Sequence, residues 1–234
     1  MSKKLTRREA LGILGAAGAA VSAACAGDTP TSASAITDAS AGGTASGACV
    51  VTPTETIGPY PSLIDLVRSD IREGRPGTPV TLTLTVVNTN AGCTPMANAV
   101  VDVWQCDAEG RYSEYNQAGY DGRSETFLRG IQTTGANGQV AFTTVYPGWY
   151  AGRATHIHVE VSVNGRSVKV TQIAFPESIN AAVYGSSVYA ARGQNPTSNS
   201  RDMVFSDGVS SELATVTGSP AGGYAATFTV GVAV

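Results

Sequence analysis

The chain has 234 residues, of which 42% are hydrophobic and 14% are charged, and its formal net charge is −3. This length suffices for a sizeable hydrophobic core and for one or two domains. The slightly acidic balance does not provide the basic face that nucleic-acid binding needs, so no nucleic-acid partner is expected.

Residues 1–26 are predicted to be an export signal. A basic segment, 3–8, precedes small apolar residues at 10–24, a stretch that is too short and too rich in Gly and Ala for a membrane span. The pair Arg7-Arg8 in the basic segment resembles a twin-arginine signal, which favours export of the protein.

The residues around Cys25 allow two forms of the exported protein. Ala24-Cys25-Ala26 fits a signal-peptidase site, and cleavage there gives a secreted protein. Residues 21–25 resemble a bacterial lipobox, with Ser22 where an aliphatic residue is usual, and Cys25 would then be the lipid-bearing first residue of an envelope lipoprotein. We favour the lipobox, and we expect membrane attachment only through such a lipid because the remaining chain is acidic.

Residues 27–48 are predicted to be a flexible linker. They are almost entirely Gly, Ala, Ser, Thr, Asp and Pro, a composition that cannot bury a core. The folded domain is therefore expected to span 49–234. Nothing in the sequence indicates its oligomeric state.

The first strand is predicted at 80–87, where Thr alternates with aliphatic residues as in a half-buried strand. A second strand is predicted at 99–104. The turn residues at 135–138 stand between apolar runs at 130–134 and 140–145, and this pattern predicts a β-hairpin.

Further along the chain, 164–165 predicts a turn between strands at 157–163 and 167–175, and 224–232 has the pattern of a last strand. Only 179–192 is compatible with short helical turns. Many short strands separated by turn residues predict an all-β fold, a two-sheet β-sandwich with short helical turns and long loops.

Three cysteines follow residue 26: Cys49, Cys93 and Cys106. In an exported protein two of them can form a disulfide. The predicted strand at 99–104 would separate Cys93 from Cys106 by roughly 20 Å or more, which is too far for a bond. We therefore favour Cys49–Cys93 with Cys106 free, and the pairing of Cys49 with Cys106 stays open.

The chain has two histidines, His156 and His158, in a strand-like segment. Residues i and i+2 share one face of a strand, about 6.6 Å apart along it, so two imidazoles can converge on one metal ion. The alternative is a pair of exposed histidines on a strand surface, since a metal site needs further ligands.

Two kinds of further ligand are available. Glu160 shares the strand face of the histidines and would complete a ferrous site with two histidines and one carboxylate. A tyrosinate is a hard anionic donor that favours a trivalent ion, although a single tyrosine is more often an aromatic at the edge of a core. Periodicity alone leaves both options open. The candidate tyrosines lie in the middle of the chain: Tyr112, Tyr115, Tyr120, Tyr146 and Tyr150.

Segment 147–158, PGWYAGRATHIH, resembles the iron-binding segment of the intradiol ring-cleavage dioxygenases, the family of catechol, hydroxyquinol and protocatechuate dioxygenases, and it is most similar to the secreted branch. The resemblance extends over about 49–230. Its other motifs follow in the family's order: 56–60 (TIGPY), 101–105 (VDVWQ) with 110–112 (GRY), 127–130 (FLRG) and 171–172 (TQ).

The resemblance implies a ferric ion, Fe(III), held by Tyr112, Tyr150, His156 and His158. Tyr112 would leave the iron when substrate binds and accept a substrate proton, and Tyr150 would stay. The implied fold is a two-sheet β-sandwich, with the iron between the sheets near one end.

The resemblance also implies the reaction. The substrates would be a small catechol-type aromatic diol and O2, and the ring would open between its two hydroxyl-bearing carbons to a muconate-type dicarboxylate. Arg153 would stabilise negative charge on the bound substrate, Gln172 would lie beside it, and Tyr60 would line the substrate pocket.

Two alternatives come from other protein classes. A cupin-like metal enzyme would need a carboxylate four or five residues after His158, where Ser162 and Val163 stand, and a further histidine downstream, which the sequence lacks. A non-enzymatic binding module, a common use of secreted β-sandwiches, would expose aromatic platforms such as Trp104 or Trp149.

Overall fold

The computed structural model describes residues 49–234, and the predicted export signal (1–26, with Cys25) and linker (27–48) lie outside this part. Within it, strands dominate, as predicted. In chain order the elements are β1 (Pro79–Asn88), η2 (Thr89–Ala91), β2 (Thr94–Pro95), β3 (Val100–Trp104), β4 (Asn116–Gln117), β5 (Tyr120–Asp121), β6 (Arg129–Thr133), β7 (Gln139–Val145), β8 (His156–Val163), β9 (Arg166–Ala174), α1 (Glu177–Tyr184), η3 (Ser187–Tyr189), η4 (Asn199–Arg201), β10 (Thr215–Ser219) and β11 (Gly223–Val232).

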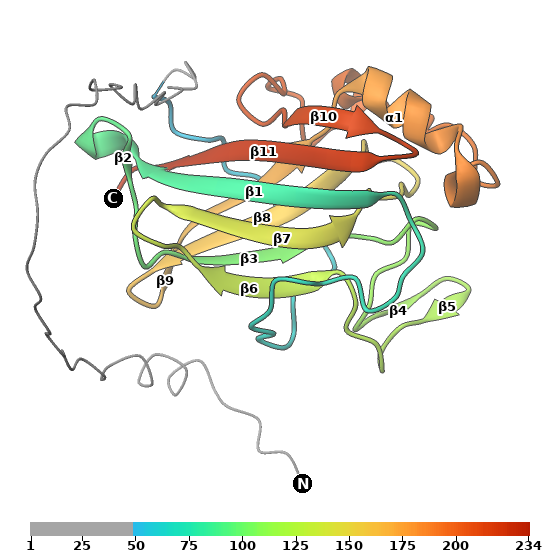
Figure 1. Ribbon diagram of the computed structural model, residues 1–234, viewed down its shortest axis with the longest axis horizontal. Helices are drawn as coiled ribbons and strands as arrows, with labels where there is room; N and C mark the ends of the chain where they lie inside the picture. Colours follow the sequence, from blue (N-terminus) through green and yellow to red (C-terminus); the bar gives the residue numbers. More distant parts are fainter. Residues whose placement is uncertain (1–48) are drawn as a thin grey trace, which may run out of the picture. The chain divides into compact units, whose positions relative to one another are not determined.

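The long strands form two sheets that pack face to face (Figure 1), so the predicted two-sheet β-sandwich is confirmed. One sheet has the order β10-β11-β1-β2, with β7 also paired to β1, and the other has the order β6-β3-β8-β9. Strand β1 pairs in parallel with β11, so the first and last strands of the domain lie side by side. The remaining two strands, β4 and β5, form a separate two-stranded sheet.

Alternating side chains of the long strands fill the space between the two sheets. In β1, Leu82, Leu84 and Val86 are fully buried, whereas the threonines between them are partly or fully exposed. From the other sheet, Val103 and Val159 join the same apolar cluster. Burying each such side chain contributes about 1.5–3 kcal/mol. The period-two pattern predicted at 80–87 is therefore the core-facing pattern of a sandwich strand.

The hairpin predicted around 135–138 is wrong, although the turn forms, with the Gly138 amide donating to Gly135 O at 2.9 Å. Strand β6 pairs with β3, whereas β7 pairs with β1, so the two strands belong to opposite sheets. Turn residues determine only that the chain reverses direction. The partner is decided by burial, because β7 places Val140 and Phe142 in the core from the β1 side.

The other predicted elements agree better with the structure. Asn164 and Gly165, with φ of 51° and 73°, form the predicted turn between β8 and β9. Helix α1 and turn η3 overlap the predicted helical stretch at 179–192. Turns η2 and η4 and strands β2, β4, β5 and β10 were not predicted. Strand β10 is an edge strand with four of its five residues exposed, so it has no alternating apolar pattern.

A disulfide joins Cys49 to Cys93, and Cys106 is free and buried, as we favoured. In the chain-entropy description, a bond that spans 44 residues stabilises a fold by about 4 kcal/mol. The Thr52 amide also donates to Gly231 O at 3.0 Å. The first described residues are therefore tied to the five-stranded sheet.

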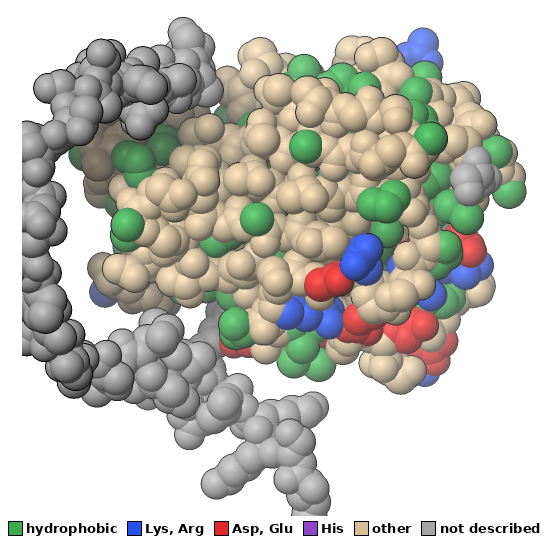
Figure 2. All heavy atoms as spheres, viewed as in Figure 1, with side chains coloured by type: hydrophobic (Ala, Val, Ile, Leu, Met, Phe, Trp, Pro, Cys, Tyr) green, Lys and Arg blue, Asp and Glu red, His purple; other side chains and the backbone are tan. Residues whose placement is uncertain are grey.

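Figure 2 shows the face over β1 and β11, which presents mostly uncharged surface. The Lys, Arg, Asp and Glu side chains visible in this view gather toward the side where Figure 1 draws β4 and β5. Within residues 49–234, none of the helices has the length and hydrophobicity needed to cross a lipid bilayer.

Candidate metal centre

Strand β8 carries both histidines of the chain. Ile157, Val159 and Val161 belong to the apolar core between the sheets. His156 and His158 alternate with these residues, so they point to the outer side of the four-stranded sheet. They are nevertheless only 3% and 1% exposed, because loops cover them. The expectation that the site lies between the sheets is therefore wrong, since loops rather than the second sheet enclose it.

The four residues predicted to bind iron come together on this outer side. Tyr150 Oη lies 3.1 Å from His156 Nε2, and His156 Nε2 lies 3.2 Å from His158 Nε2. The centroid of the Tyr112 ring lies 5.8 Å from that of Tyr150 and 6.2 Å from that of His158. Tyr112 comes from the loop after β3 and Tyr150 from the loop after β7. Three separate segments therefore converge on one point.

The hydrogen bonding of His156 directs its Nε2 lone pair to this point. Its Nδ1 lies 2.6 Å from the carbonyl oxygen of Ala154, so Nδ1 carries the hydrogen and donates it. Burial lowers the pKa of His156 to about 3, and it lowers the pKa of His158 well below its ordinary value. Both imidazoles are therefore neutral near pH 7, as metal donors must be.

The hydroxyl of Tyr112 is not satisfied by its neighbours. Tyr112 is fully buried, and its Oη has no hydrogen-bond partner among the described residues. Such a buried group costs about 1–3 kcal/mol. Burial also raises the pKa of Tyr112 well above its ordinary value and that of Tyr150 to about 12. A bound cation would satisfy these oxygens and favour their ionised forms.

The spacing of the donor atoms also fits one metal ion. Donors that bind a single transition-metal ion at about 2 Å lie about 3 Å from one another. The Tyr150–His156 and His156–His158 separations of 3.1 and 3.2 Å match this value. Phenol oxygens and neutral imidazole nitrogens are a donor set suited to iron.

The structure does not support the alternative with two histidines and one carboxylate. In residues 49–234, the one group of three histidine, cysteine or acidic donor atoms within 4.8 Å of one another is Glu55, Asp207 and Glu212, which contains no histidine. Glu160 lies further along β8, opposite Asp102 of β3. The tyrosines are therefore the further ligands that the geometry provides.

Two neighbours hold the His158 ring in place. Trp104 of β3 is fully buried and stacks on it, with an interplanar angle of 4° and a centroid distance of 4.9 Å. Gly58 also lies against the ring, since a Cβ there would lie 2.8 Å from His158 Cε1. The φ of Gly58, 77°, also favours glycine. The motifs at 56–60 and 101–105 thus position a candidate ligand.

A buried arginine joins the segments that carry Tyr60 and Tyr112. Arg129 donates to Tyr60 O at 2.9 Å and to Ser113 O at 2.7 Å, and it lies 3.3 Å from Glu114. The Tyr60 ring packs on the Tyr112 ring with a centroid distance of 4.9 Å. Sequence resemblance marked Arg129 as part of a motif, and the structure shows what its side chain holds together.

Arg153 and Gln172 lie together, as the resemblance implied, and the structure adds a third residue. Arg153 Nε donates to both carboxylate oxygens of Asp202, at 3.0 and 2.9 Å, and Arg153 Nη2 donates to Gln172 Oε1. Gln172 donates in turn to Thr56 O at 2.8 Å. Asp202 is buried and lies 49 residues after Arg153, so no local motif could have indicated it.

Neither tryptophan forms the exposed platform that a binding module would need. Trp104 is fully buried. Trp149 is partly buried, its indole N–H donates to Gly193 O at 3.0 Å, and the Arg192 guanidinium lies 4.4 Å from its ring centroid.

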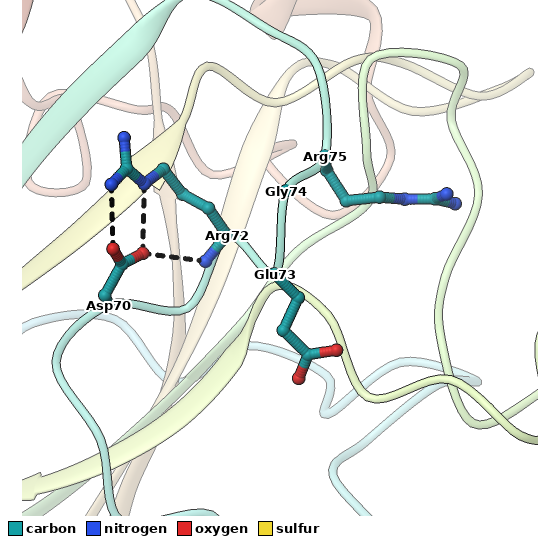
Figure 3. Close-up of a pocket in the computed structure, with 5 residues that line it drawn as sticks. All are labelled: Asp70, Arg72, Glu73, Gly74 and Arg75. Carbon is teal, nitrogen blue, oxygen red and sulfur yellow. Dashed lines mark hydrogen bonds and ion pairs between the residues drawn. The ribbon is translucent and has the colours of Figure 1, made fainter.

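A cavity of about 630 Å³ reaches Tyr150, one of the four candidate ligands, and Tyr60 lines it as well. Its volume is typical of sites for small molecules. A second hollow of about 520 Å³ is lined by residues between 70 and 75 (Figure 3). There Arg72 Nη2 pairs with Asp70 Oδ2 at 2.7 Å, and none of the predicted site residues is present, so this hollow is not a candidate site.

Comparison with known proteins agrees with this geometry. The family model described as Dioxygenase matches residues 58–194, which include all four candidate ligands. The solved structure of an intradiol ring-cleavage dioxygenase from Tetranychus urticae is 30% identical, with a TM-score of 0.72 over 79% of this chain and 95% of that chain. The dioxygenase domain of a dioxygenase–carbohydrate-binding protein fusion from Streptomyces sp. SirexAA-E is 29% identical, with a TM-score of 0.58 over 79% of this chain and 99% of that chain.

Two curated relatives match over shorter stretches. Chlorocatechol 1,2-dioxygenase of Rhodococcus opacus is 27% identical over 124 residues, which are 45% of this chain and 46% of that protein. Catechol 1,2-dioxygenase 1 of Acinetobacter lwoffii is 30% identical over 96 residues, which are 33% of this chain and 30% of that protein. The chain thus spans less than half the length of the curated relatives it matches.

Proposed function

Since this chain belongs to the family of intradiol ring-cleavage dioxygenases, which use non-haem iron, we propose that it opens catechol-type aromatic rings with O2. The bond between the two hydroxyl-bearing carbons breaks, and both atoms of O2 enter the product, so that catechol gives a muconate-type dicarboxylate. The observation that carries this proposal is the convergence of Tyr150, His156 and His158 beside the unpartnered hydroxyl of Tyr112.

We propose Fe(III) as the metal, held by Tyr112, Tyr150, His156 and His158. Two phenolates and two neutral imidazoles supply two negative charges, which favour a trivalent ion over a divalent one. When bound, the ferric ion would act as a Lewis acid that lowers the pKa of the substrate hydroxyls and makes the ring reactive toward O2.

Tyr112 is proposed to act as a base as well as a ligand. Its ring lies between those of Tyr60 and Tyr150, with centroid distances of 4.9 and 5.8 Å. Burial raises its pKa well above the ordinary value, so its phenolate, once released, readily takes a proton from a substrate hydroxyl. The Tyr112 oxygen is thus the proposed destination of one substrate proton.

Arg153 is proposed to stabilise negative charge on the bound substrate. The side chains of Asp202 and Gln172 hold its guanidinium, so it needs little reorganisation during the reaction. Gln172 is itself fixed by the backbone of the segment that leads to Tyr60. Tyr60, which lines the cavity, forms one wall of the proposed substrate site.

The test is a visible absorption spectrum of the purified protein with iron, recorded before and after catechol is added without oxygen. We expect a strong tyrosinate-to-iron absorption band that moves to longer wavelength with catechol. After oxygen is admitted, O2 consumption and muconate formation should agree mole for mole. A protein that stays colourless after ferric or ferrous iron is supplied would contradict the proposal.

We also propose that the protein is exported, either secreted or held in the cell envelope by a lipid on Cys25. The Cys49–Cys93 disulfide supports this, because disulfides persist in oxidising compartments. Fractionation of cells that express the wild type or Cys25→Ser tests both parts. A wild-type protein found only in the cytoplasm would contradict export, and an unchanged fractionation of Cys25→Ser would contradict lipid attachment.

A further inference from the structure

The cavity beside the metal centre carries an uncompensated positive charge. Its charged lining residues are Glu109, Arg111 and Arg192. Arg111 Nη1 lies 2.6 Å from Glu109 Oε2, so these two charges neutralise each other. Arg192 has no acidic partner among the described residues, and its guanidinium lies over the ring of Trp149. The cavity therefore favours an anionic group near Arg192.

Arg192 is held in position although it is exposed. Its guanidinium carbon lies 4.4 Å from the ring centroid of Trp149, and its amide donates to Tyr189 O at 3.0 Å. The hydroxyl of the buried Tyr189 donates to Tyr146 O at 2.6 Å, and the next residue, Gly193, accepts from Trp149 Nε1 at 3.0 Å. Because the Trp149 ring holds its side chain and hydrogen bonds hold its backbone, Arg192 loses little conformational entropy when it binds an anion.

The same cavity connects Arg192 with the metal centre. Tyr150, a candidate ligand, lines the cavity together with Arg192 and follows Trp149 in the chain. The cavity volume of about 630 Å³ leaves room beyond a single aromatic ring for a ring substituent. Arg153 does not line this cavity, and Asp202 compensates its charge. Arg192 is thus the residue suited to a second, charged part of the substrate.

We propose that Arg192 binds a carboxylate on the substrate, so that the preferred substrates are catechols with an acidic side group, such as 3,4-dihydroxybenzoate or 3,4-dihydroxycinnamate. A guanidinium binds a carboxylate through two parallel hydrogen bonds, and no other side chain of this cavity offers them with an uncompensated charge. This inference rests on the proposed ring cleavage and specifies its substrate class.

The test compares two substrates with the iron-loaded protein. We expect Arg192→Gln to raise KM for 3,4-dihydroxybenzoate about 10- to 100-fold. The uncharged 4-methylcatechol should change by less than about threefold, because it offers nothing to the guanidinium. Arg166→Gln, an exposed arginine at the turn between β8 and β9, is the control for loss of a positive charge and should leave both substrates unchanged.

Arg192→Glu sharpens the test, since it should turn the preference toward the amine 3,4-dihydroxyphenethylamine. Equal losses on the acidic and the uncharged substrate, or no loss on the acid, would overturn the proposal. If the wild type opens none of these rings, the result contradicts the proposed ring cleavage but does not test the role of Arg192. Calorimetric binding of 3,4-dihydroxybenzoate without oxygen then decides the role of Arg192, because a weaker Kd in Arg192→Gln supports the carboxylate site and equal Kd values contradict it.

Discussion

The two faces of strand β8 bury their side chains almost equally but serve different purposes. The inward face places Ile157, Val159 and Val161 against the second sheet, where apolar contacts leave nothing unsatisfied. The outward face buries His156 and His158 under loops, next to a hydroxyl that has no partner within residues 49–234. Burial alone therefore does not distinguish the two faces of this strand, whereas the polar groups buried beside the outward face do.

The tyrosines show the same difference. The hydroxyl of Tyr146, in the core, donates to Asn180 Oδ1 at 2.7 Å. The hydroxyl of Tyr112, equally buried, donates to no described residue. Tyr146 thus has its polar atom paired within the protein, whereas Tyr112 keeps that atom available for a ligand.

Neighbouring substitutions on β8 should give the largest contrast. We expect His158→Ala to lower kcat/KM for catechol by more than about 100-fold and to abolish the visible iron band, because it removes a ligand. Val159→Ala, one residue further and on the opposite face, should keep the band and lower the free energy of unfolding by about 2 kcal/mol. Absorption spectra and urea denaturation measure the two effects. A retained band in His158→Ala would show that the outward face does not bind the metal.

The two kinds of tyrosine can be separated in the same way. Tyr150→Phe should shift or weaken the visible band and lower kcat about 10- to 100-fold, since three ligands remain. Tyr146→Phe should leave the spectrum unchanged and cost about 1–2 kcal/mol of unfolding free energy, because Asn180 loses a donor. Identical spectra for the two variants would contradict the assignment of Tyr150 to the metal centre and Tyr146 to the core.

A smaller effect is expected for the residue that holds Arg153. Asp202→Asn should lower kcat about 10-fold with little change in KM, because the arginine loses its fixed position but not its charge. Stopped-flow kinetics of ring opening measure this effect. The visible band of the iron-loaded variant should stay as in the wild type. A lost band would show that Asp202 is needed for iron binding and not only for the position of Arg153.

The prediction with the least effect on catalysis concerns pH and a carboxyl outside the site. Burial raises the pKa of Asp102 to about 7, whereas an unfolded aspartate titrates near 4. Between about pH 4 and 7 the folded protein thus binds a proton that the unfolded chain does not, and this residue's contribution to stability falls as pH rises. Asp102→Asn should therefore gain stability relative to the wild type by about 1–3 kcal/mol from pH 4 to 8.

Urea denaturation across this pH range measures the difference in unfolding free energy between Asp102→Asn and the wild type. The opposing contribution of the buried histidines is the same in both proteins, so it cancels in this difference. Asp70→Asn is the control. Hydrogen bonds from Arg72 already lower the pKa of Asp70 to about 2, so its contribution is constant above pH 5. A constant difference between Asp102→Asn and the wild type would show that Asp102 is ionised in the folded protein.

The sequence was sufficient where local patterns decide the structure. Alternation at 80–87 predicted a strand with one buried face, and the spacing of His156 and His158 predicted that both would lie on one side of β8. The tyrosines were identified through family motifs, since nothing in the periodicity distinguished Tyr150 from Tyr146.

Long-range contacts were not predictable from one sequence. The turn at 135–138 gave no information on the sheet to which each strand belongs. Asp202 reaches Arg153 through a loop that has no recognisable motif, and Arg192 meets Trp149 across 43 residues. The wrong placement of the iron between the sheets came from the family resemblance, and alternation could not correct it, because alternation tells which residues share a face but not what covers that face.

The stacking of Trp104 on His158 provides the protein with its own reporter. The chain has two tryptophans, and Trp149 lies under Arg192. All of the indole fluorescence of the protein therefore originates beside a candidate ligand or at the proposed carboxylate site. A metal whose absorption overlaps the tryptophan emission quenches that emission by energy transfer. An anion that draws Arg192 away from the Trp149 ring changes the emission of Trp149 that is left after metal binding. Metal loading and substrate arrival can thus be followed as two separate changes in emission, without a label.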